Sequence, residues 1–290
     1  MQADAIDELK LLTGRLLANQ VRATAKSFDD AEFKVFSQFG DDGIIQYLIA
    51  RLDIPAELRT FVEFGVQDYS ESNTRFLLLN DNWRGLVMDG DERNIESLKS
   101  RDMYWRHDLT ALCRWIDRDN INAFLQESGF SGPIGILSID IDGNDYWVWQ
   151  RIEVVQPVIV IAEYNSVFGV RQAVTVPYDP AFNRTSAHFS NLYWGASLSA
   201  LSSLARSKGY AFVGSNRAGN NAYFIHEKYI GRGGVVSLTP EQGYVESRFR
   251  ESRNEGGALT YIGGAERRYM IAGMPVYDVD QNAVVTLERE

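Results

Sequence analysis

The stretch FVEFGVQDYSESNTRFLLLNDNWRGLVMDGDERN, residues 61–94, decides the fold class. Two nearly continuous apolar runs, Thr60–Val66 and Gly85–Asp89, flank a segment with helical character, Glu71–Asn80. Strands that do not alternate apolar with polar residues are buried on both faces, which is typical of parallel strands covered by helices. The stretch therefore predicts a strand–helix–strand unit of an α/β protein.

The same alternation continues along the chain. Further strands are predicted at Tyr104–His107, Ile134–Ile141, Pro157–Glu163, Tyr210–Gly214 and Ala222–His226, and further helices at Glu92–Ser100, Asp119–Glu127, Asn144–Ile152 and Ala196–Lys208. The last two strands are separated only by SNRAGNN, which is too short for a parallel crossover and predicts an antiparallel pair. Five βα units followed by such a pair are typical of the Rossmann-like class I methyltransferase fold, an α/β architecture with a seven-stranded, mostly parallel sheet.

Segments at both ends extend this core. Residues 1–52 are predicted to form an N-terminal helical extension, residues 53–230 the α/β core, and residues 231–290 a C-terminal extension packed on the core. Apolar side chains recur at helical spacing near the N-terminus, at Ile6, Leu9, Leu12, Leu16 and Val21. We expect this helix to cover the domain or to pair with a second subunit in a homo-oligomer.

Composition excludes several classes of partner. The chain has 290 residues and a formal net charge of -10, and an acidic surface repels phosphate backbones, so no nucleic-acid partner is expected. Its one cysteine, Cys113, allows neither an intrachain disulfide nor a cysteine-based metal cage. No apolar stretch approaches the 18 residues of a membrane span, and the N-terminus lacks a signal pattern. We expect a soluble, cytoplasmic protein without membrane contact.

The first two strands end in residues suited to a nucleotide-like cofactor. Glu63 and Gly65 lead into a strand-to-helix turn that ends at Thr74, and a glycine there lets the backbone approach a ligand. Asp89 ends the second strand 24 residues after Gly65, close to the ~20 residues that separate a glycine turn from a ribose-binding carboxylate. Asp108, after the third predicted strand, is expected to contact the adenine.

Acidic side chains end the next two strands. Asp140 and Asp142 lie in LSIDIDGND, and Glu163 and Asn165 lie in VIVIAEYN. If these strands are neighbours, four oxygen-bearing side chains converge, and oxygen ligands suit Mg²⁺. Two alternatives stay open: Asp140 is a general base, or some of these residues cap helices and turns.

The segment from Asn165 to Gly195 is predicted to be a long irregular loop, and such loops in compact domains are usually functional. Its many aromatic residues suit stacking on sugar rings, and Asn183, Arg184 and Asn191 can bond hydroxyls, so we expect it to close over a small-molecule or carbohydrate acceptor. His188 lies in this loop and could take a proton from an acceptor hydroxyl, because a histidine titrates near neutral pH. The alternative for His188 is an exposed side chain without a role.

Together these segments resemble the FkbM-like branch of S-adenosylmethionine-dependent methyltransferases. The resemblance covers residues 36–226 and is most specific in LSIDIDGND and EYN. It implies the cofactor S-adenosylmethionine and O-methylation of natural products or cell-surface sugars. By this match, the cofactor positions are Glu63, Gly65 and Asp89, and the acceptor-side acidic motif is Asp140 and Asp142. Relatives carry more glycine in the first loop, where this chain has Gln67 and Tyr69.

The sequence therefore predicts an S-adenosylmethionine-dependent O-methyltransferase acting on a sugar or natural product. One alternative is a metal-dependent glycosyltransferase that holds a nucleotide sugar through Asp140-Ile141-Asp142. Another is a non-catalytic binding protein on a methyltransferase scaffold. The pairing of Gly65 with Asp89 favours the methyltransferase.

Overall fold

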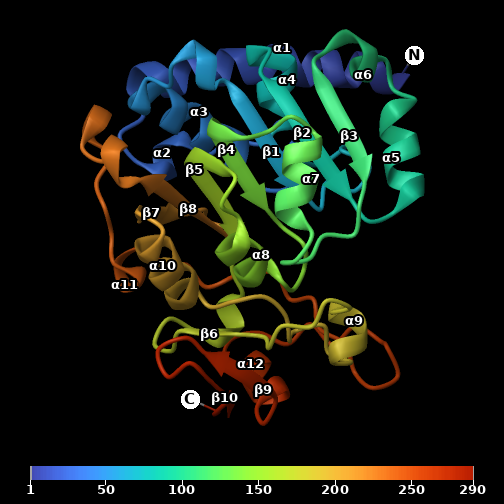
Figure 1. Cartoon of the computed structure of the whole chain (residues 1–290), viewed down its shortest axis with the longest axis vertical. Helices are drawn as coiled ribbons and strands as arrows, with labels where there is room; N and C mark the ends of the chain where they lie inside the picture. The colour runs from blue at the N-terminus through green and yellow to red at the C-terminus, as the bar shows by residue number, and fades with distance from the viewer. Residues whose placement is uncertain (1, 290) are drawn as a thin grey trace.

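The computed structural model describes residues 2–289, with side chains from residue 5 onward. Its centre is a seven-stranded sheet in the order β3-β2-β1-β4-β5-β8-β7 (Figure 1). The strands are β1 (Thr60–Phe64), β2 (Arg84–Asp89), β3 (Leu109–Cys113), β4 (Gly132–Ile139), β5 (Val155–Glu163), β7 (Tyr210–Ser215) and β8 (Asn221–His226). Strands β1 to β5 are parallel, and β8 inserts antiparallel between β5 and β7. This order confirms the predicted Rossmann-like class I methyltransferase fold and its terminal antiparallel pair.

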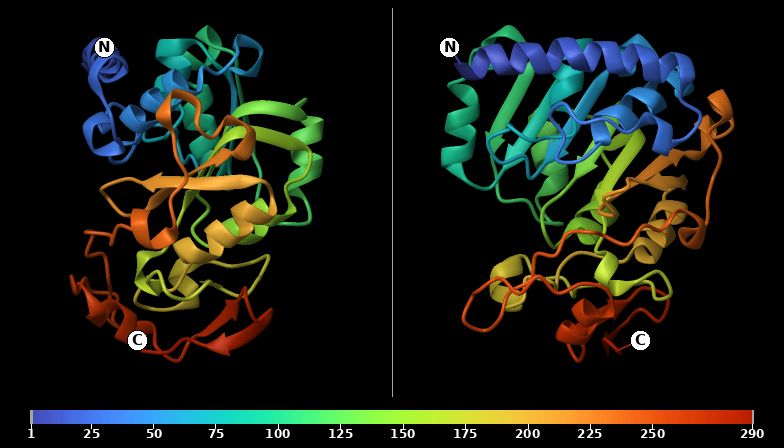
Figure 2. Two further views of the ribbon diagram at one scale, coloured as in Figure 1. Left: turned by 90° about the vertical axis from the view of Figure 1, so that its left-hand side faces the viewer. Right: turned by 180° about the vertical axis from the view of Figure 1, so that it is seen from behind.

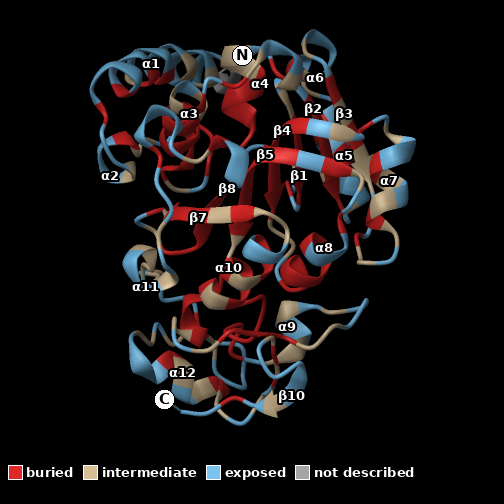
Figure 3. Ribbon diagram, turned by 60° about the vertical axis from the view of Figure 1, so that its left-hand side comes forward, coloured by how far each residue is buried: buried red, intermediate tan, exposed pale blue. Residues whose placement is uncertain are grey.

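Helices cover both faces of the sheet. They are α1 (Gln2–Thr24), α2 (Phe28–Ala31), α3 (Asp41–Leu52), α4 (Arg75–Asp81), α5 (Glu92–Lys99), α6 (Asp102–Arg106), α7 (Ile121–Glu127), α8 (Asp145–Arg151), α9 (Arg184–Ala187), α10 (Leu198–Ser207), α11 (Pro240–Gly243) and α12 (Ala265–Ile271), with short 3-10 turns η1 (Ala56–Leu58), η2 (Ser166–Phe168), η3 (Glu227–Tyr229) and η4 (Arg232–Gly234). Val62 and Phe64 of β1 pack in the core layer with α7, α8 and α10, whereas Phe61 packs in the layer with α3, α4 and α5. Burial on both sides explains the continuous apolar runs (Figure 3). Among the described residues, no helix is both long and apolar enough to cross a membrane.

The third strand was wrongly placed by the sequence. Tyr104 and Arg106 belong to helix α6, and the strand is β3, two residues beyond His107. Trp105 is 72% exposed, whereas Tyr104 is partly buried against the core, so these two aromatic residues do not form a strand of the sheet. Strand β3 pairs only with β2, at the sheet edge, and buries alternate residues. An edge strand of this kind lacks the continuous apolar signal of its neighbours.

Helix α1 lies across one end of the molecule (Figure 2). The sequence grouped Val21 with four apolar residues further toward the N-terminus, but the structure separates them. Val21 is buried against the body together with Gly14 and Ala18. The other four face solvent, namely Ile6, Leu9, Leu12 and Leu16. Helix α1 therefore covers the body, which was one of the two expected alternatives, but it does so through Gly14, Ala18 and Val21 and not through these four side chains.

The segment from Asn165 to Gly195 is built into a second layer at the opposite end of the molecule from α1 (Figure 1). Its strand β6 (Val174–Thr175) pairs with β9 (Pro275–Asp278), which pairs with β10 (Ala283–Thr286). Phe168 and Tyr193, two aromatics of this segment, are buried in the same small core as Ile271 and Leu287. Much of the predicted loop is thus held in place by the C-terminal segment.

Candidate functional site

A cavity of about 910 Å³ opens at the carboxyl ends of the parallel strands. This edge of the sheet is where ligands bind in open α/β folds, at the point where the strand order reverses between β1 and β4. Five predicted site residues line it: Gly65, Asp89, Asp140, Asp142 and Glu163. Asn183, Arg184 and Asn191 of the long loop also line it, whereas the residues that sequence reasoning missed include Gln38, Gln67, Arg114, Trp115 and Glu251.

Gly65 is required by a close backbone approach. Its φ is +72°, and a Cβ at this position would lie 1.6 Å from the carbonyl oxygen of Asp140. The glycine therefore lets the end of β1 pass the end of β4. Gly65 lines the cavity, but the group that excludes a side chain at this position is the backbone carbonyl of Asp140, not a ligand.

Glu63 and Thr74 shape the turn behind the cavity wall. The buried Glu63 carboxylate accepts hydrogen bonds from the backbone N–H of Asn73 at 2.9 Å and of Thr74 at 3.1 Å, and also from the Thr74 and Ser72 hydroxyls. Burial raises the pKa of Glu63. Neither Glu63 nor Thr74 lines the cavity. The structure therefore does not bring these two predicted cofactor contacts to the site, because their polar atoms are used to hold the turn.

Two residues in this turn replace the glycines that the resemblance led us to expect. Gln67 and Tyr69 both adopt left-handed backbone conformations, with φ of +49° and +62°. The fully buried Tyr69 shares a 2.9 Å hydrogen bond with the Thr74 hydroxyl, and the Gln67 N–H donates to Asp89 at 2.8 Å. Such conformations are uncommon in residues with a side chain and persist only where the surroundings fix them.

Asp89 ends β2 with its carboxylate at the cavity wall. It accepts hydrogen bonds from the backbone N–H of Gln67 and, at 2.9 Å, of Asp91, and from the Asn94 amide at 3.0 Å. The bond to Gln67 uses one carboxylate oxygen and the other two bonds use the second, so the group retains acceptor capacity. The predicted place of Asp89 at the end of β2 matches the structure. Its contact with a ribose stays a prediction.

Asp108 lies at the opposite edge of the sheet. Its carbonyl oxygen accepts a hydrogen bond from Gly85, near the start of β2, and its side chain does not line the cavity. The structure therefore does not bring this predicted adenine contact to the cavity, because β3 begins after Asp108 instead of ending before it. The residues that follow β3 are Arg114 and Trp115, and both line the cavity. The Trp115 indole N–H donates to the carbonyl of Pro180 at 2.8 Å, which fixes the ring beside the cavity.

Asp140, Asp142 and Glu163 form an acidic cluster on the far side of the cavity. Each offers an oxygen within 4.8 Å of the others. Burial raises the pKa of Asp140 and of Glu163 well above their usual values, and the negative charges of the neighbouring carboxylates raise them further. The Glu163 Oε2 is buried and has no hydrogen-bond partner among the described residues. The cluster can therefore bind a cation or accept a proton.

Asp145 holds the turn that carries this cluster. Its carboxylate accepts hydrogen bonds from the backbone N–H of Ile141 and Gly143, both at 2.9 Å. Burial raises the pKa of Asp145 to about 6. The carboxylates of the DIDGND motif, residues 140–145, therefore have two roles. Asp140 and Asp142 line the cavity, while Asp145 holds the backbone of the turn.

The structure does not bring Asn165 to the cluster. Its amide donates to the carbonyls of Leu192 and Trp194, both at 2.9 Å, and its Oδ1 accepts from the Val167 N–H at 3.0 Å. Asn165 therefore joins β5 to the second layer. The structure does not support the predicted role of Asn165 as a fourth metal ligand. Instead, Asn165 caps the turn η2, which is the alternative that the sequence analysis had left open.

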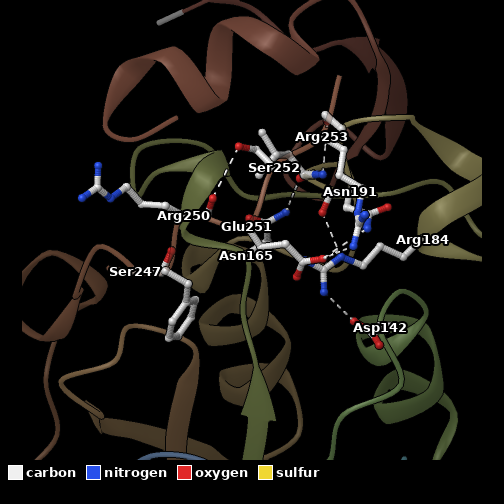
Figure 4. Close-up of polar contacts among 12 residues, drawn as sticks. Asp142, Asn165, Arg184, Asn191, Ser247, Arg250, Glu251, Ser252 and Arg253 are labelled. Atoms are coloured by element: carbon white, nitrogen blue, oxygen red, sulfur yellow. Dashed lines mark hydrogen bonds and ion pairs between the residues drawn. The ribbon is translucent and has the colours of Figure 1, made fainter. Parts of the chain in front are cut away.

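Arg184 is a cation beside Asp142, one member of the acidic cluster (Figure 4). Its Nη1 lies 2.9 Å from the Asp142 carboxylate, and its Nη2 lies 3.6 Å from Glu251. Its Nε donates to the carbonyl of Asn191 at 2.8 Å, and its guanidinium stacks 4.8 Å from the centre of the Trp194 ring. Arg184 therefore ties the second layer to the end of β4.

His188 makes its side-chain contacts within its own loop. Its Nδ1 shares a 2.7 Å hydrogen bond with the Ser190 hydroxyl, and its ring packs against Phe189 at 4.4 Å. Burial lowers its pKa. Because His188 is not among the residues that line the cavity, the structure does not support its predicted role as the base.

A smaller cavity of about 260 Å³ adjoins the main one. The two share Gln38, Glu163, Arg184 and Glu251. Aromatic residues form much of the smaller wall, namely Phe39, Tyr164, Trp194 and Phe249. The rings of Phe39 and Phe249 stack 4.6 Å apart, so the segment after α11 closes this wall. The contributing residues lie far apart in sequence, and no local motif signals them.

Comparison with known proteins adds solved structures but no close relative. No protein-family model matches this sequence. No curated protein matches it. The chain is similar to the N-terminal domain of EvdMO1 with SAH bound, with 8% identity, a TM-score of 0.39, and 73% of this chain and 94% of that chain covered. It is also similar to an O-methyltransferase from Bacillus cereus in complex with SAH, with 12% identity, a TM-score of 0.39, and coverage of 74% and 89%.

A third similar structure is an O-methyltransferase family protein from Burkholderia thailandensis, with 14% identity, a TM-score of 0.36, and coverage of 74% and 70%. The fold assignment rests on the strand order within this chain, with β8 antiparallel between β5 and β7. The chain therefore has the Rossmann-like class I methyltransferase fold.

Proposed function

We propose that this protein is an S-adenosylmethionine-dependent methyltransferase that methylates a hydroxyl of a sugar or natural product. The observation that carries the proposal is one cavity, at the switch point of this fold, with Asp89 on one side and the acidic cluster of Asp140, Asp142 and Glu163 on the other. The strand order also favours a methyltransferase over the glycosyltransferase alternative. The narrower FkbM-like assignment rests on the sequence motifs around these residues.

The residues present fit this cofactor. The cavity volume of about 910 Å³ is in the upper part of the range for small-molecule sites. Asp89 retains acceptor capacity for ribose hydroxyls, and Trp115 offers a ring at the end of β3 where an adenine is expected. When bound, S-adenosylmethionine supplies an activated methyl group on a cationic sulfonium. The acidic lining favours a positive charge at this place.

Glu163 lines both cavities, whereas Asp140 and Asp142 line only the larger one, so Glu163 lies where the two cavities adjoin. We propose that the acceptor occupies the smaller cavity, with a hydroxyl directed toward Asp140 and Glu163. Aromatic faces such as those of Trp194 and Phe249 suit a sugar ring. The high pKa of Asp140 and Glu163 makes this pair suited to take the proton that the hydroxyl loses.

The same cluster fits a divalent cation such as Mg²⁺. Three carboxylates and the unpartnered Glu163 Oε2 are hard oxygen donors, and a cation would relieve their mutual repulsion. Asp142 would then divide its carboxylate between the cation and Arg184. The proposal therefore has two forms, in which Asp140 and Glu163 either hold a cation that orients the acceptor or act directly as the base.

A transfer screen tests this function. Tritiated methyl transfer is measured against nucleotide sugars, glycosylated metabolites, peptides and RNA, with and without excess chelator. We expect label in the carbohydrate-bearing acceptors and loss of transfer in Glu163→Gln. The matched control is Glu127→Gln at the end of α7, which should keep full activity. Label confined to protein or RNA would overturn the proposed acceptor class. Full turnover in excess chelator would exclude the form with a bound cation and leave only the form in which Asp140 and Glu163 act as the base.

A further inference from the structure

Helix α1 has two apolar faces on opposite sides. One face packs on the body through Gly14, Ala18 and Val21. The opposite face points to solvent, where Leu9 is 64%, Leu12 56% and Leu16 73% exposed. Attachment of α1 to the body needs only the first face. The second face joins no hydrophobic core of the described residues.

The solvent face has the spacing of a coiled-coil seam. Its central positions advance in steps of four and three residues, and all are exposed: Ala5, Leu9, Leu12, Leu16, Asn19 and Ala23. This alternation keeps the seam on one side of a helix that pairs with another helix. Ile6, at 52% exposure, widens the seam at its N-terminal end. A face meant only for solvent has no reason to repeat leucine in this pattern.

We propose that this face pairs antiparallel with the same face of a second copy of the chain. Glu8 and Arg15 lie on one flank of the seam, one heptad apart and both exposed. When Leu9 meets the partner's Leu12, Ala5 meets the partner's Leu16, and Glu8 lies opposite the partner's Arg15. The two-fold axis repeats each contact, so two opposite-charge pairs flank the seam.

The charges favour this arrangement over the others. A parallel pair would set Glu8 beside the partner's Thr13 and Arg15 beside the partner's Gln20, with no opposite charges in contact. A membrane surface is disfavoured, because interfacial helices carry a basic polar face whereas this chain has a net charge of -10. A single helix pair is smaller than the interfaces of stable dimers, so we expect a weak, reversible dimer.

The pairing leaves the candidate site open. Helix α1 lies at one end of the molecule, and α9, which carries Arg184, lies at the other (Figure 1). The two proposals are therefore independent, and a failure of one says nothing about the other.

Sedimentation velocity of the full chain between about 1 and 100 µM tests the pairing. We expect the wild-type protein to shift from monomer to dimer, and Leu12→Glu to weaken the dimer by at least about tenfold. Leu259→Glu is the matched control, since Leu259 is 45% exposed on the C-terminal segment and should leave the dimer intact. Circular dichroism checks that the variants keep their fold.

Charge reversal tests the orientation. Glu8→Arg alone sets two arginines together and should weaken the dimer, whereas Glu8→Arg with Arg15→Glu should restore it. In a Cys113→Ser background, Leu9→Cys protein mixed with Leu12→Cys protein should crosslink more than either protein alone. A wild-type monomer at 100 µM, or a dimer unaffected by Leu12→Glu, would overturn the proposal. Flotation with anionic phosphatidylserine vesicles, lost in Leu12→Glu and without any dimer, would overturn it in favour of a membrane contact.

Discussion

Gly65→Ala is expected to destabilise the whole domain, beyond any effect on the cofactor. An alanine at a φ of +72° costs about 1–2 kcal/mol relative to glycine. Its Cβ would also lie 1.6 Å from the Asp140 carbonyl oxygen, where real Cβ atoms essentially never come within 3.0 Å. The ends of β1 and β4 must then separate, and overpacking of this kind costs about 1–3 kcal/mol more. We therefore expect a loss of about 2–5 kcal/mol in the free energy of unfolding.

Gly132→Ala is the matched control for this prediction. Gly132 has a φ of +71°, but a Cβ there meets nothing within 4 Å, so the substitution should cost only the backbone part, about 1–2 kcal/mol. Urea denaturation followed by circular dichroism measures both variants. A Gly65→Ala protein no less stable than Gly132→Ala would refute the reasoning. If it also lost cofactor binding, Gly65 would serve ligand approach instead.

Three further predictions concern individual site residues. Glu163→Gln should raise the thermal midpoint of unfolding at pH 7.5. The pKa of Glu163 is raised in the folded protein, so the wild type loses stability as the pH rises above 4.5, the usual pKa of this carboxyl. Calorimetry over a pH series should therefore show the gain in thermal midpoint vanishing near pH 4. Asp108→Ala should leave the affinity for S-adenosylhomocysteine unchanged within about twofold, whereas Trp115→Ala should weaken it by about tenfold. Fluorescence titration measures both affinities, and equal losses in the two variants would show that Asp108 contributes to the site. Asn165→Ala should lower the free energy of unfolding, measured by urea denaturation, by about 2–3 kcal/mol. The substitution leaves the carbonyls of Leu192 and Trp194 and the N–H of Val167 without their hydrogen bonds. An unchanged free energy of unfolding would contradict the role of Asn165 in holding the second layer.

Burial explains which elements the sequence could predict. Strands β1, β2, β4 and β5 are buried on both faces, so their apolar runs stand out. Strand β3 pairs on one side only, and its alternating pattern was weaker than the aromatic run in α6. The aromatics between Asn165 and Gly195 suggested ligand contacts, yet many of them pack on a C-terminal layer about a hundred residues away. No local sequence pattern predicts packing between segments so far apart in the chain.

The same limit applies to the site. Asp89, Asp140 and Glu163 were predictable because the carboxyl ends of parallel strands meet at one edge. Asn165 carries the right chemistry two residues beyond β5, but the chain has turned there and its amide braces the turn. Arg184 comes from a short helix outside the sheet, and Glu251 from an irregular segment, so strand spacing cannot place them.

Isothermal calorimetry with S-adenosylhomocysteine tests the central claim most directly. The account predicts micromolar-range binding by the wild-type protein and a loss of at least about tenfold in Asp89→Ala, because that carboxylate would hold the ribose hydroxyls. Asp102→Ala, at the start of α6 and outside the cavity, should bind as the wild type does. No heat and no thermal shift with the wild-type protein, or equal binding by Asp89→Ala, would contradict the account.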